Sequence, residues 1–283
     1  MNSRLLYHTK SFIKLVLERK VPLSRIFEYW KFFINPYCNK FLISLPRAGW
    51  NYVELVLDLA VDIENGGEGN YYYDENTEYW MPDTKIANVF DWNTPAKLDE
   101  NEINLIKNKG LNCYFNNHSP LSELFSYNIE KLNGVVLIRD MISYLESRFY
   151  HLGYKDGDYD KFIQNSDALE FVVRFFNDLN DHIISNDNIV VIKYEELMKS
   201  PLQNFKKISN QLNIIVSEES IDKAISLSSK ENMQKRFDNK ESLNTNRRIS
   251  VKKRKPFNQK ELENITDYLS KNLKNDFGYL NYD

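Results

Sequence analysis

Three short polar segments carry residues that bind anions or transfer protons, and each follows a short apolar run. The first is LPRAGWNY, residues 45–52, between the apolar run 41–45 and a segment with helical spacing. Backbone N–H groups at such a strand-to-helix turn bind anions, and Gly49 allows a phosphate to approach closely. The G-x-x-x-x-G-K-[ST] spacing of a Walker A loop is absent. Because strand-to-helix turns with Pro and Gly are common, this segment alone does not establish a phosphate site.

The second segment contains Arg139, directly after the apolar run 134–138, and Ser147, eight residues later in a segment with helical spacing. Ligands of open parallel sheets bind outside the carboxyl ends of the strands, where we expect Arg139. The planar guanidinium group makes paired, charge-assisted hydrogen bonds to phosphate. The alternative interpretation is a surface ion pair, with Asp140 capping the helix that follows.

The third segment is NNHSP, residues 116–120, which contains His118 after the short apolar run 113–115. Histidine is the usual general base near neutral pH. A single histidine at a strand end is more often structural. Its position along the chain, between the two candidate phosphate segments, favours a catalytic role.

The elements that would position these residues alternate along the chain. Apolar runs at 41–45, 113–115, 134–138 and 189–192 are typical of buried strands, and helical spacing appears between and after them. This alternation predicts an α/β fold in which helices flank a central parallel sheet. We expect helices at 141–152, 168–184, 201–213, 218–227 and 258–274.

We expect a single domain over residues 1–283, because the sequence has no internal repeat and no linker-like segment. Residues 1–40 are predicted to form a helical extension of two short helices. Residues 62–83 combine acidic and aromatic residues with three glycines and no Lys or Arg, which favours a long loop or lid.

The composition of the sequence argues against several classes of function. The net charge of −3 over 283 residues and the pI of about 5.9 argue against a nucleic-acid partner. No run of about 18 apolar residues occurs, so no membrane span is expected. The two cysteines form neither a disulfide framework nor a zinc motif. We expect a cytoplasmic protein, and the sequence does not indicate an oligomeric state.

Taken in order, these segments resemble the motifs of sulfotransferases that use 3′-phosphoadenosine-5′-phosphosulfate (PAPS). The phosphosulfate loop of that family reads roughly P-[KR]-[ST]-G-T-T-W, to which residues 46–52 are similar, and its catalytic histidine lies in a T-H-x-P-like segment, similar to residues 117–120. Its arginine and serine for the 3′-phosphate match Arg139 and Ser147. The later family motifs Y-E-[DE]-L, S-F-x-x-M and R-K-G resemble residues 194–197, 229–233 and 247–249. The resemblance begins near residue 41 and continues to the end of the sequence.

The resemblance implies a P-loop-NTPase-like sulfotransferase fold, PAPS as the sulfuryl donor with 3′-phosphoadenosine-5′-phosphate (PAP) as its product, and no required metal. It implies catalytic roles for His118 and Arg47. The donor-binding residues that it implies are Arg47, Ala48, Gly49, Trp50, Asn51, Tyr52, Arg139, Ser147, Tyr194, Ser229, Met233, Arg247 and Arg248.

The sequence departs from the family pattern at several of these positions. Arg47 stands where the family usually has lysine, and it keeps the charge but cannot donate a proton at working pH. Trp50 and Asn51 replace a threonine pair, and Tyr52 replaces a tryptophan that packs near adenine. Lys230 and Ile249 replace the phenylalanine and glycine of the two later motifs.

The acceptor is a small molecule whose identity the sequence leaves open. The acidic and aromatic segment 62–83 suits a cationic or amine-bearing natural product, through ion pairs and cation–π contacts. A hydroxylated sugar or a phenol, or a plain solvated loop without a substrate, remain alternatives. The candidate acceptor residues are Tyr72, Tyr73, Asp74, Glu75, Glu78 and Trp80.

Two other functions fit parts of the pattern. One is a P-loop-type small-molecule kinase, which the missing Walker lysine and the Arg139 and Ser147 pair argue against. The other is a nucleotide-binding module without catalysis, suggested by the altered threonine pair. The presence of His118 favours an enzyme.

Overall fold

The structure is a computed structural model that describes residues 40–74, 79–82, 89–91, 114–118, 120, 133–184, 186–229, 231–232 and 257–280. The predicted helical extension at 1–40 lies outside the described residues, apart from Lys40. Among the described residues, no helix is both long enough and apolar enough to cross a membrane.

A parallel sheet forms the centre of the described fold, with five strands in the order β4-β5-β1-β6-β7. Every neighbouring pair is parallel. This confirms the predicted α/β class, because each predicted apolar run supplies a strand. The strands are β1 (Lys40–Ser44), β4 (Val89–Asp91), β5 (Tyr114–Asn117), β6 (Asn133–Ile138) and β7 (Ile189–Lys193).

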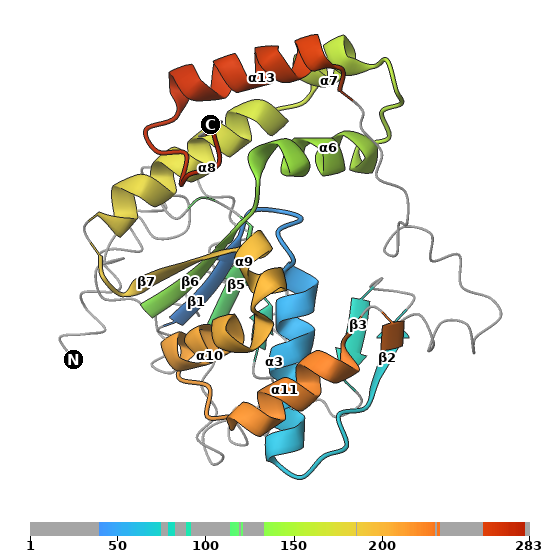
Figure 1. Cartoon of the computed structure of the whole chain (residues 1–283), viewed down its shortest axis with the longest axis vertical. Helices are drawn as coiled ribbons and strands as arrows, with labels where there is room; N and C mark the ends of the chain where they lie inside the picture. Colours follow the sequence, from blue (N-terminus) through green and yellow to red (C-terminus); the bar gives the residue numbers. More distant parts are fainter. Residues whose placement is uncertain are drawn as a thin grey trace, which may run out of the picture.

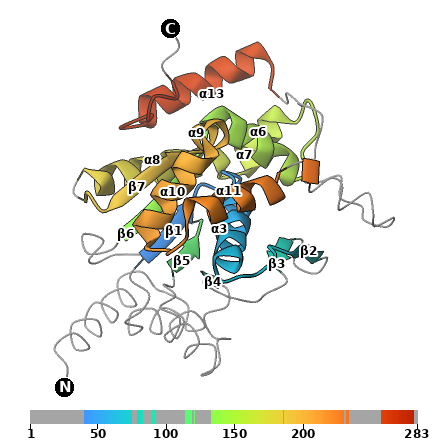
Figure 2. The same ribbon diagram turned by 60° about the horizontal axis from the view of Figure 1, so that its bottom comes forward.

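Helices cover both faces of the sheet (Figure 1, Figure 2). One layer contains α3 (Trp50–Glu64), α9 (Tyr194–Lys199), α10 (Pro201–Leu212) and α11 (Glu218–Leu227). The other contains α6 (Met141–His151), α7 (Tyr159–Asn165), α8 (Ala168–Ile183) and α13 (Gln259–Asn272), with α13 packed outside α8. Because both faces are covered, the central strands consist of consecutive apolar residues rather than alternating ones.

Local signals account for several helix boundaries. The Asp140 side chain caps α6 by accepting the N–H of Ser143 at 2.7 Å. Pro201 occupies the first turn of α10, and that helix ends at Asn213 in the left-handed conformation. Asn258 and Glu261 form a reciprocal capping box at the start of α13.

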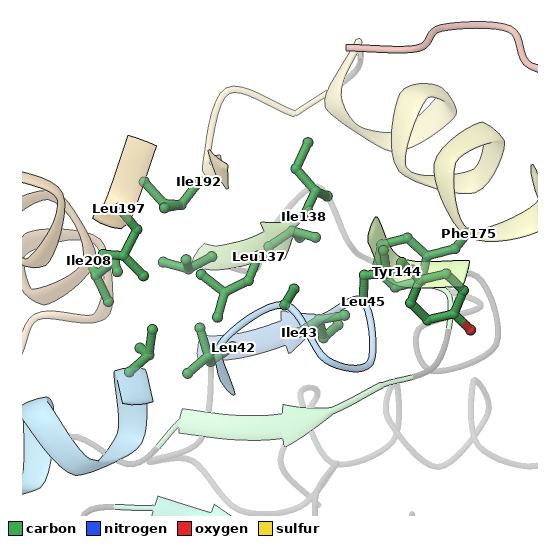
Figure 3. Close-up of a cluster of buried hydrophobic side chains, with 14 of the residues drawn as sticks. Leu42, Ile43, Leu45, Leu137, Ile138, Tyr144, Phe175, Ile192, Leu197 and Ile208 are labelled. Carbon is green, nitrogen blue, oxygen red and sulfur yellow. The ribbon is translucent and has the colours of Figure 1, made fainter. Parts of the chain in front are cut away.

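Both helical layers contribute to one hydrophobic core around β1 and β6 (Figure 3). Leu42 and Ile43 of β1 are completely buried, as is every residue of β6 from Val135 to Ile138. Side chains from each layer close over them, and those labelled in the figure include Tyr144, Phe175, Leu197 and Ile208. The rigid sheet therefore fixes the positions of the loops that leave its carboxyl edge.

The prediction of a loop at residues 62–83 is wrong, because the segment contains the end of a helix and two strands. Residues 62–64 complete α3, and β2 (Tyr71–Asp74) pairs antiparallel with β3 (Tyr79–Pro82) beside α3 (Figure 1). The aromatic residues of this segment favour extended backbone, and this preference outweighs the loosening effect of the glycines. The buried ring of Tyr71 and its hydroxyl, which donates to the carbonyl of Leu227 at 2.5 Å, attach the hairpin to the end of α11.

Candidate functional site

Three loops and the first turn of α9 meet at the carboxyl edge of the sheet. They follow β1, β5, β6 and β7, and they carry Arg47, His118, Arg139 and Tyr194. The chain adds β4 and β5 on one side of β1, and β6 and β7 on the other. Such a reversal of strand order opens a crevice at the carboxyl ends, where open α/β sheets bind ligands.

The loop after β1 brings its backbone close to this crevice. Arg47 and Gly49 have φ angles of 69° and 85°, in the left-handed region that favours glycine. The first amides of α3 that donate to a carbonyl of this turn are those of Tyr52 and Val53, both to Gly49. Helix geometry leaves the N–H groups that precede them without intrahelical acceptors, which makes this turn suitable for binding an anion.

Gly49 is required here for a second reason. A Cβ atom at this position would lie 2.6 Å from Cδ2 and from Cε2 of Tyr194. The Tyr194 ring therefore packs directly against the backbone of the loop. Tyr194 is also the first residue of α9, so a helix beginning at the end of β7 supports the loop that follows β1.

Arg139 lies between the loop and this tyrosine. Its Nη1 atom donates to the carbonyl oxygen of Arg47 at 3.1 Å, and its Cζ atom lies 5.1 Å from the centre of the Tyr194 ring. Its buried Nε–H has no acceptor among the described residues. An unsatisfied guanidinium donor at a strand end suits an anionic ligand. The predicted helix cap at Asp140 is present, and within the part of the chain that the structure describes, Arg139 binds the loop rather than a carboxylate.

Ser147 links α6 to the same loop. The Nε–H group of Arg47 donates to Ser147 Oγ at 3.1 Å, across 100 positions of sequence. The motif resemblance assigns Arg47 to the phosphosulfate loop and Ser147 to the 3′-phosphate site. The structure brings these two side chains into contact. The two side chains come from separate elements of the fold, the loop after β1 and α6.

His118 is exposed and lies beside the end of β1. Its Nδ1 atom is 3.0 Å from the carbonyl oxygen of Ser44 and 3.0 Å from Ser44 Oγ. A carbonyl oxygen only accepts, so the Ser44 carbonyl favours the neutral tautomer that has its proton on Nδ1 and its lone pair on Nε2. An imidazole oriented through one nitrogen and basic at the other has the arrangement of a general base.

Trp50 connects His118 to α3. The ring centres of Trp50 and His118 are 4.8 Å apart, and the Trp50 Nε1–H group donates to Glu54, one helical turn later. Asp58 follows after another turn, on the same side of α3. Burial raises the pKa of Asp58 to about 7. This side of α3 therefore combines an aromatic ring next to the histidine with two carboxyl groups.

Tyr52 and Ala48 contribute to the packing beneath the loop. Ala48 is fully buried, and the Tyr52 ring makes an edge contact with Phe205 of α10, with centres 5.6 Å apart. Burial, and to a smaller extent neighbouring Tyr194, raise the pKa of Tyr52. Asn51 is partly exposed in the first turn of α3.

The structure describes the remaining predicted site residues only in part. Ser229 lies in the turn after α11, where its hydroxyl accepts the N–H of Asn232 at 3.3 Å. The backbones of Tyr72, Tyr73 and Asp74 lie in β2 and that of Trp80 in β3. Met233, Arg247 and Arg248, and the acidic residues Glu75 and Glu78, lie outside the described residues.

Sequence reasoning assigned no role to Ser44, Glu54 or Glu195. Ser44 is the last residue of an apolar strand, and this polar strand end was a usable signal. Glu54 stands four residues after Trp50, the spacing at which helical side chains meet. Glu195 accepts the Asp140 N–H at 3.1 Å, a contact across 55 positions that no local pattern indicates.

Comparisons with known proteins identify the family and the fold. A family model described as the sulfotransferase domain matches residues 39–277. The crystal structure of mouse sulfotransferase SULT7A1 complexed with PAP superposes with a TM-score of 0.53 and 17% identity, over 84% of this chain and 85% of that one. A retinol dehydratase in a complex with retinol and PAP gives a TM-score of 0.51 and 16% identity, over 89% and 86% of the two chains. No curated protein matches the sequence.

Proposed function

The chain belongs to the sulfotransferase family, and on this premise we propose that it transfers a sulfuryl group from PAPS to a small-molecule acceptor. The observation that carries the proposal is the convergence of Arg47, Arg139, Ser147 and His118 at one carboxyl edge of the sheet. These residues come from three separate loops and one helix. The two compared structures hold PAP, which supports the choice of donor.

The residues present fit a donor with two phosphate-bearing ends. The amides at the start of α3 and the Arg47 side chain would hold the 5′-phosphosulfate. Arg139, whose Nε–H lacks an acceptor among the residues that the structure describes, and Ser147 would hold the 3′-phosphate. Tyr52 and Ser229 would lie toward the adenosine, as would Met233, while Arg247 and Arg248 would add charge at the 3′-phosphate.

The donor supplies an activated sulfuryl group, so the protein must supply orientation, charge and a base. Transfer forms a bond from sulfur to the acceptor oxygen or nitrogen and breaks the bond from sulfur to the bridging oxygen, which leaves with PAP. Nε2 of His118 takes the acceptor proton, while Nδ1–H remains bound to the Ser44 carbonyl, which stabilises the imidazolium. Arg47 places a fixed positive charge near the leaving oxygen.

The acceptor is a cationic or amine-bearing small molecule in this proposal. Glu54 lies on the Trp50 side of α3, and β3 packs on the same helix. In this proposal the predicted acceptor residues of the hairpin segment would supply further carboxylates and aromatic rings: Tyr72, Tyr73, Asp74, Glu75, Glu78 and Trp80. A cation would gain ion pairs and cation–π contacts there.

The decisive experiment combines ligand binding with turnover. PAP should raise the melting temperature far more than adenosine 5′-phosphate (AMP), because only PAP carries the 3′-phosphate. A mass-spectrometric screen of acceptors with PAPS should then detect the gain of one sulfuryl group. Equal stabilisation by PAP and AMP would remove Arg139 and Ser147 from the donor site.

Catalysis is tested by His118→Ala, which should lower turnover by about 10²–10⁴-fold while PAP still binds. The control is His182→Ala, which removes a histidine of α8 whose Nε2 lies 3.7 Å from Asp178, away from the site. Wild-type rates in His118→Ala would exclude this histidine from the reaction.

The acceptor class is tested separately, by neutralising Asp74, Glu75 and Glu78 together. Since each partly exposed ion pair contributes about 0.2–1 kcal/mol, KM for a cationic acceptor should rise by roughly 3-fold or more at low salt, while PAP affinity is unchanged. The matched control neutralises three exposed carboxylates of the α7 and α13 layer: Asp160, Glu263 and Asp267. An equal KM in both triple variants would contradict the cationic acceptor.

A further inference from the structure

Arg139 and Asp140 form a corner where the chain leaves the sheet and enters α6. Pairing in β6 ends at Ile138, opposite Lys193 of β7. Asp140 is the N-cap of α6, so its own N–H group has no acceptor within that helix. That N–H donates instead to Oε1 of Glu195 at 3.1 Å.

The first turn of α9 holds this corner at two points. The Tyr194 ring lies beneath the Arg139 guanidinium, 5.1 Å from Cζ to the ring centre. Glu195, the next residue, binds the backbone directly after Arg139. One helical turn therefore fixes both the side chain of the arginine and the peptide that orients it.

The second oxygen of Glu195 is also engaged. The hydroxyl of Tyr279 donates to Glu195 Oε2 at 2.8 Å, from a turn 84 positions further along the chain. Burial, followed by this hydrogen bond and the Glu195 charge, raises the pKa of Tyr279, so its hydroxyl remains a donor at neutral pH. With both oxygens occupied, the carboxylate is held in one orientation.

Tyr279 is itself held by the turn that carries it. The Asp276 carboxylate accepts the N–H groups of Gly278 at 2.8 Å and Leu280 at 2.9 Å. The Tyr279 ring lies 5.0 Å from Lys193 Nζ and contacts the ring of Phe176. The hydroxyl is therefore delivered to Glu195 by a structured turn that packs against β7 and α8.

We propose that Glu195 and Tyr279 are positioning residues for the 3′-phosphate, acting through Arg139 and through the start of the helix that carries Ser147. This inference rests on the proposed function, because it assumes that Arg139 and Ser147 bind that phosphate. Neither residue touches the donor. They reduce the conformational freedom of Arg139 and Ser147, which bind the 3′-phosphate directly. Less conformational entropy is therefore lost when the donor binds.

The test uses two variants that leave the charge of the site unchanged. Tyr279→Phe keeps the ring and its contacts with Lys193 and Phe176 but removes the hydroxyl. Glu195→Asp keeps the carboxylate but shortens the side chain, so that the carboxylate can no longer bind both the Asp140 N–H and the Tyr279 hydroxyl. The matched control is Tyr159→Phe, which removes a hydroxyl that binds Asn264 between α7 and α13.

Titration calorimetry of the full chain with PAP and with AMP gives the preference for the 3′-phosphate. Because a lost hydrogen bond of this kind is worth about one order of magnitude or less in an equilibrium constant, each variant should lower PAP affinity by about 3–10-fold. AMP affinity should change by less than about 2-fold, since AMP does not use Arg139. The double variant should be no worse than the stronger single variant, because both act through one chain of contacts.

The outcomes separate the two proposals. If the wild-type protein does not prefer PAP over AMP, the proposed donor site is wrong and this inference falls with it. If the wild type prefers PAP but both variants keep that preference, the positioning role alone is wrong. A parallel loss of PAP and AMP affinity would also overturn it, since that loss indicates a general structural effect.

Discussion

Replacing Gly49 by alanine should destabilise the protein more than replacing a left-handed glycine whose surroundings are open. The Ala side chain would lie 2.6 Å from two carbon atoms of the Tyr194 ring. Gly66 provides a matched control, because its φ angle is 86°, against 85° for Gly49, and nothing lies within 4 Å of its added Cβ. The two substitutions therefore share their conformational cost and differ in steric overlap.

The magnitudes follow from this comparison. The left-handed backbone conformation destabilises folded alanine by about 1–2 kcal/mol relative to glycine. The unfolded alanine chain has less conformational entropy, which offsets about 0.4–1 kcal/mol of this cost. Gly66→Ala should therefore cost roughly 0–1.6 kcal/mol. Gly49→Ala carries the same terms and adds about 1–3 kcal/mol for forcing a side chain into a packed site.

Urea unfolding of both variants measures the difference directly. A second background isolates its cause: in Tyr194→Ala protein, the ring is absent, and Gly49→Ala should cost no more than Gly66→Ala. In the wild-type background, displacement of the ring should also disturb Arg139 and weaken PAP binding. Equal unfolding free energies for the two glycine variants in the wild-type background would refute the packing of Tyr194 against the loop.

The sheet was predictable because burial on both faces produces continuous apolar strands. The runs around Leu42, Val136 and Val191 are too short for helices and end at polar or turn residues, so their pattern permits one interpretation. β4 was missed because it contributes only Val89–Asp91, which is too short to show any periodicity. The helix α7 was also missed, because its seven residues make only about two turns.

The hairpin was missed for a different reason. Its aromatic residues favour a strand, while its acidic residues and the preceding glycines favour a loop, and the composition of the whole segment conceals the local preference. Tertiary contacts resolve the conflict. The carboxylate of Asp62 accepts the N–H of Gly69 at 2.9 Å, and the buried Tyr71 binds Leu227 of α11.

The main residues of the candidate site were found by their order along the chain, but their mutual contacts were not. Arg139 at a strand end is a local signal, whereas its bond to the Arg47 carbonyl depends on the register of β1 and β6. The contact of His118 with Ser44 depends in the same way on the pairing of β1 with β5. Long-range pairs of this kind require the sheet topology, which a single sequence does not specify.

Three further predictions follow from individual residues. Asp140→Ala should lower the unfolding free energy by about 1 kcal/mol in urea, because it removes the cap of α6, and an unchanged midpoint would exclude that cap. Glu54→Gln should leave PAP affinity unchanged but weaken binding of a cationic acceptor, and unchanged acceptor binding would remove Glu54 from the acceptor site. Asp58 has its pKa raised by burial from 3.8 to about 7, so the folded protein binds a proton there more tightly than the unfolded chain does. Its contribution to stability is therefore fully present below about pH 4 and is lost as the pH rises to about 7, a change on the order of 2–4 kcal/mol. Asp58→Asn, which has no such proton to lose, should flatten this part of the stability profile and be more stable than the wild type at pH 8. Parallel profiles for the two proteins between pH 4 and pH 8 would mean that the Asp58 carboxylate is solvated in the folded state.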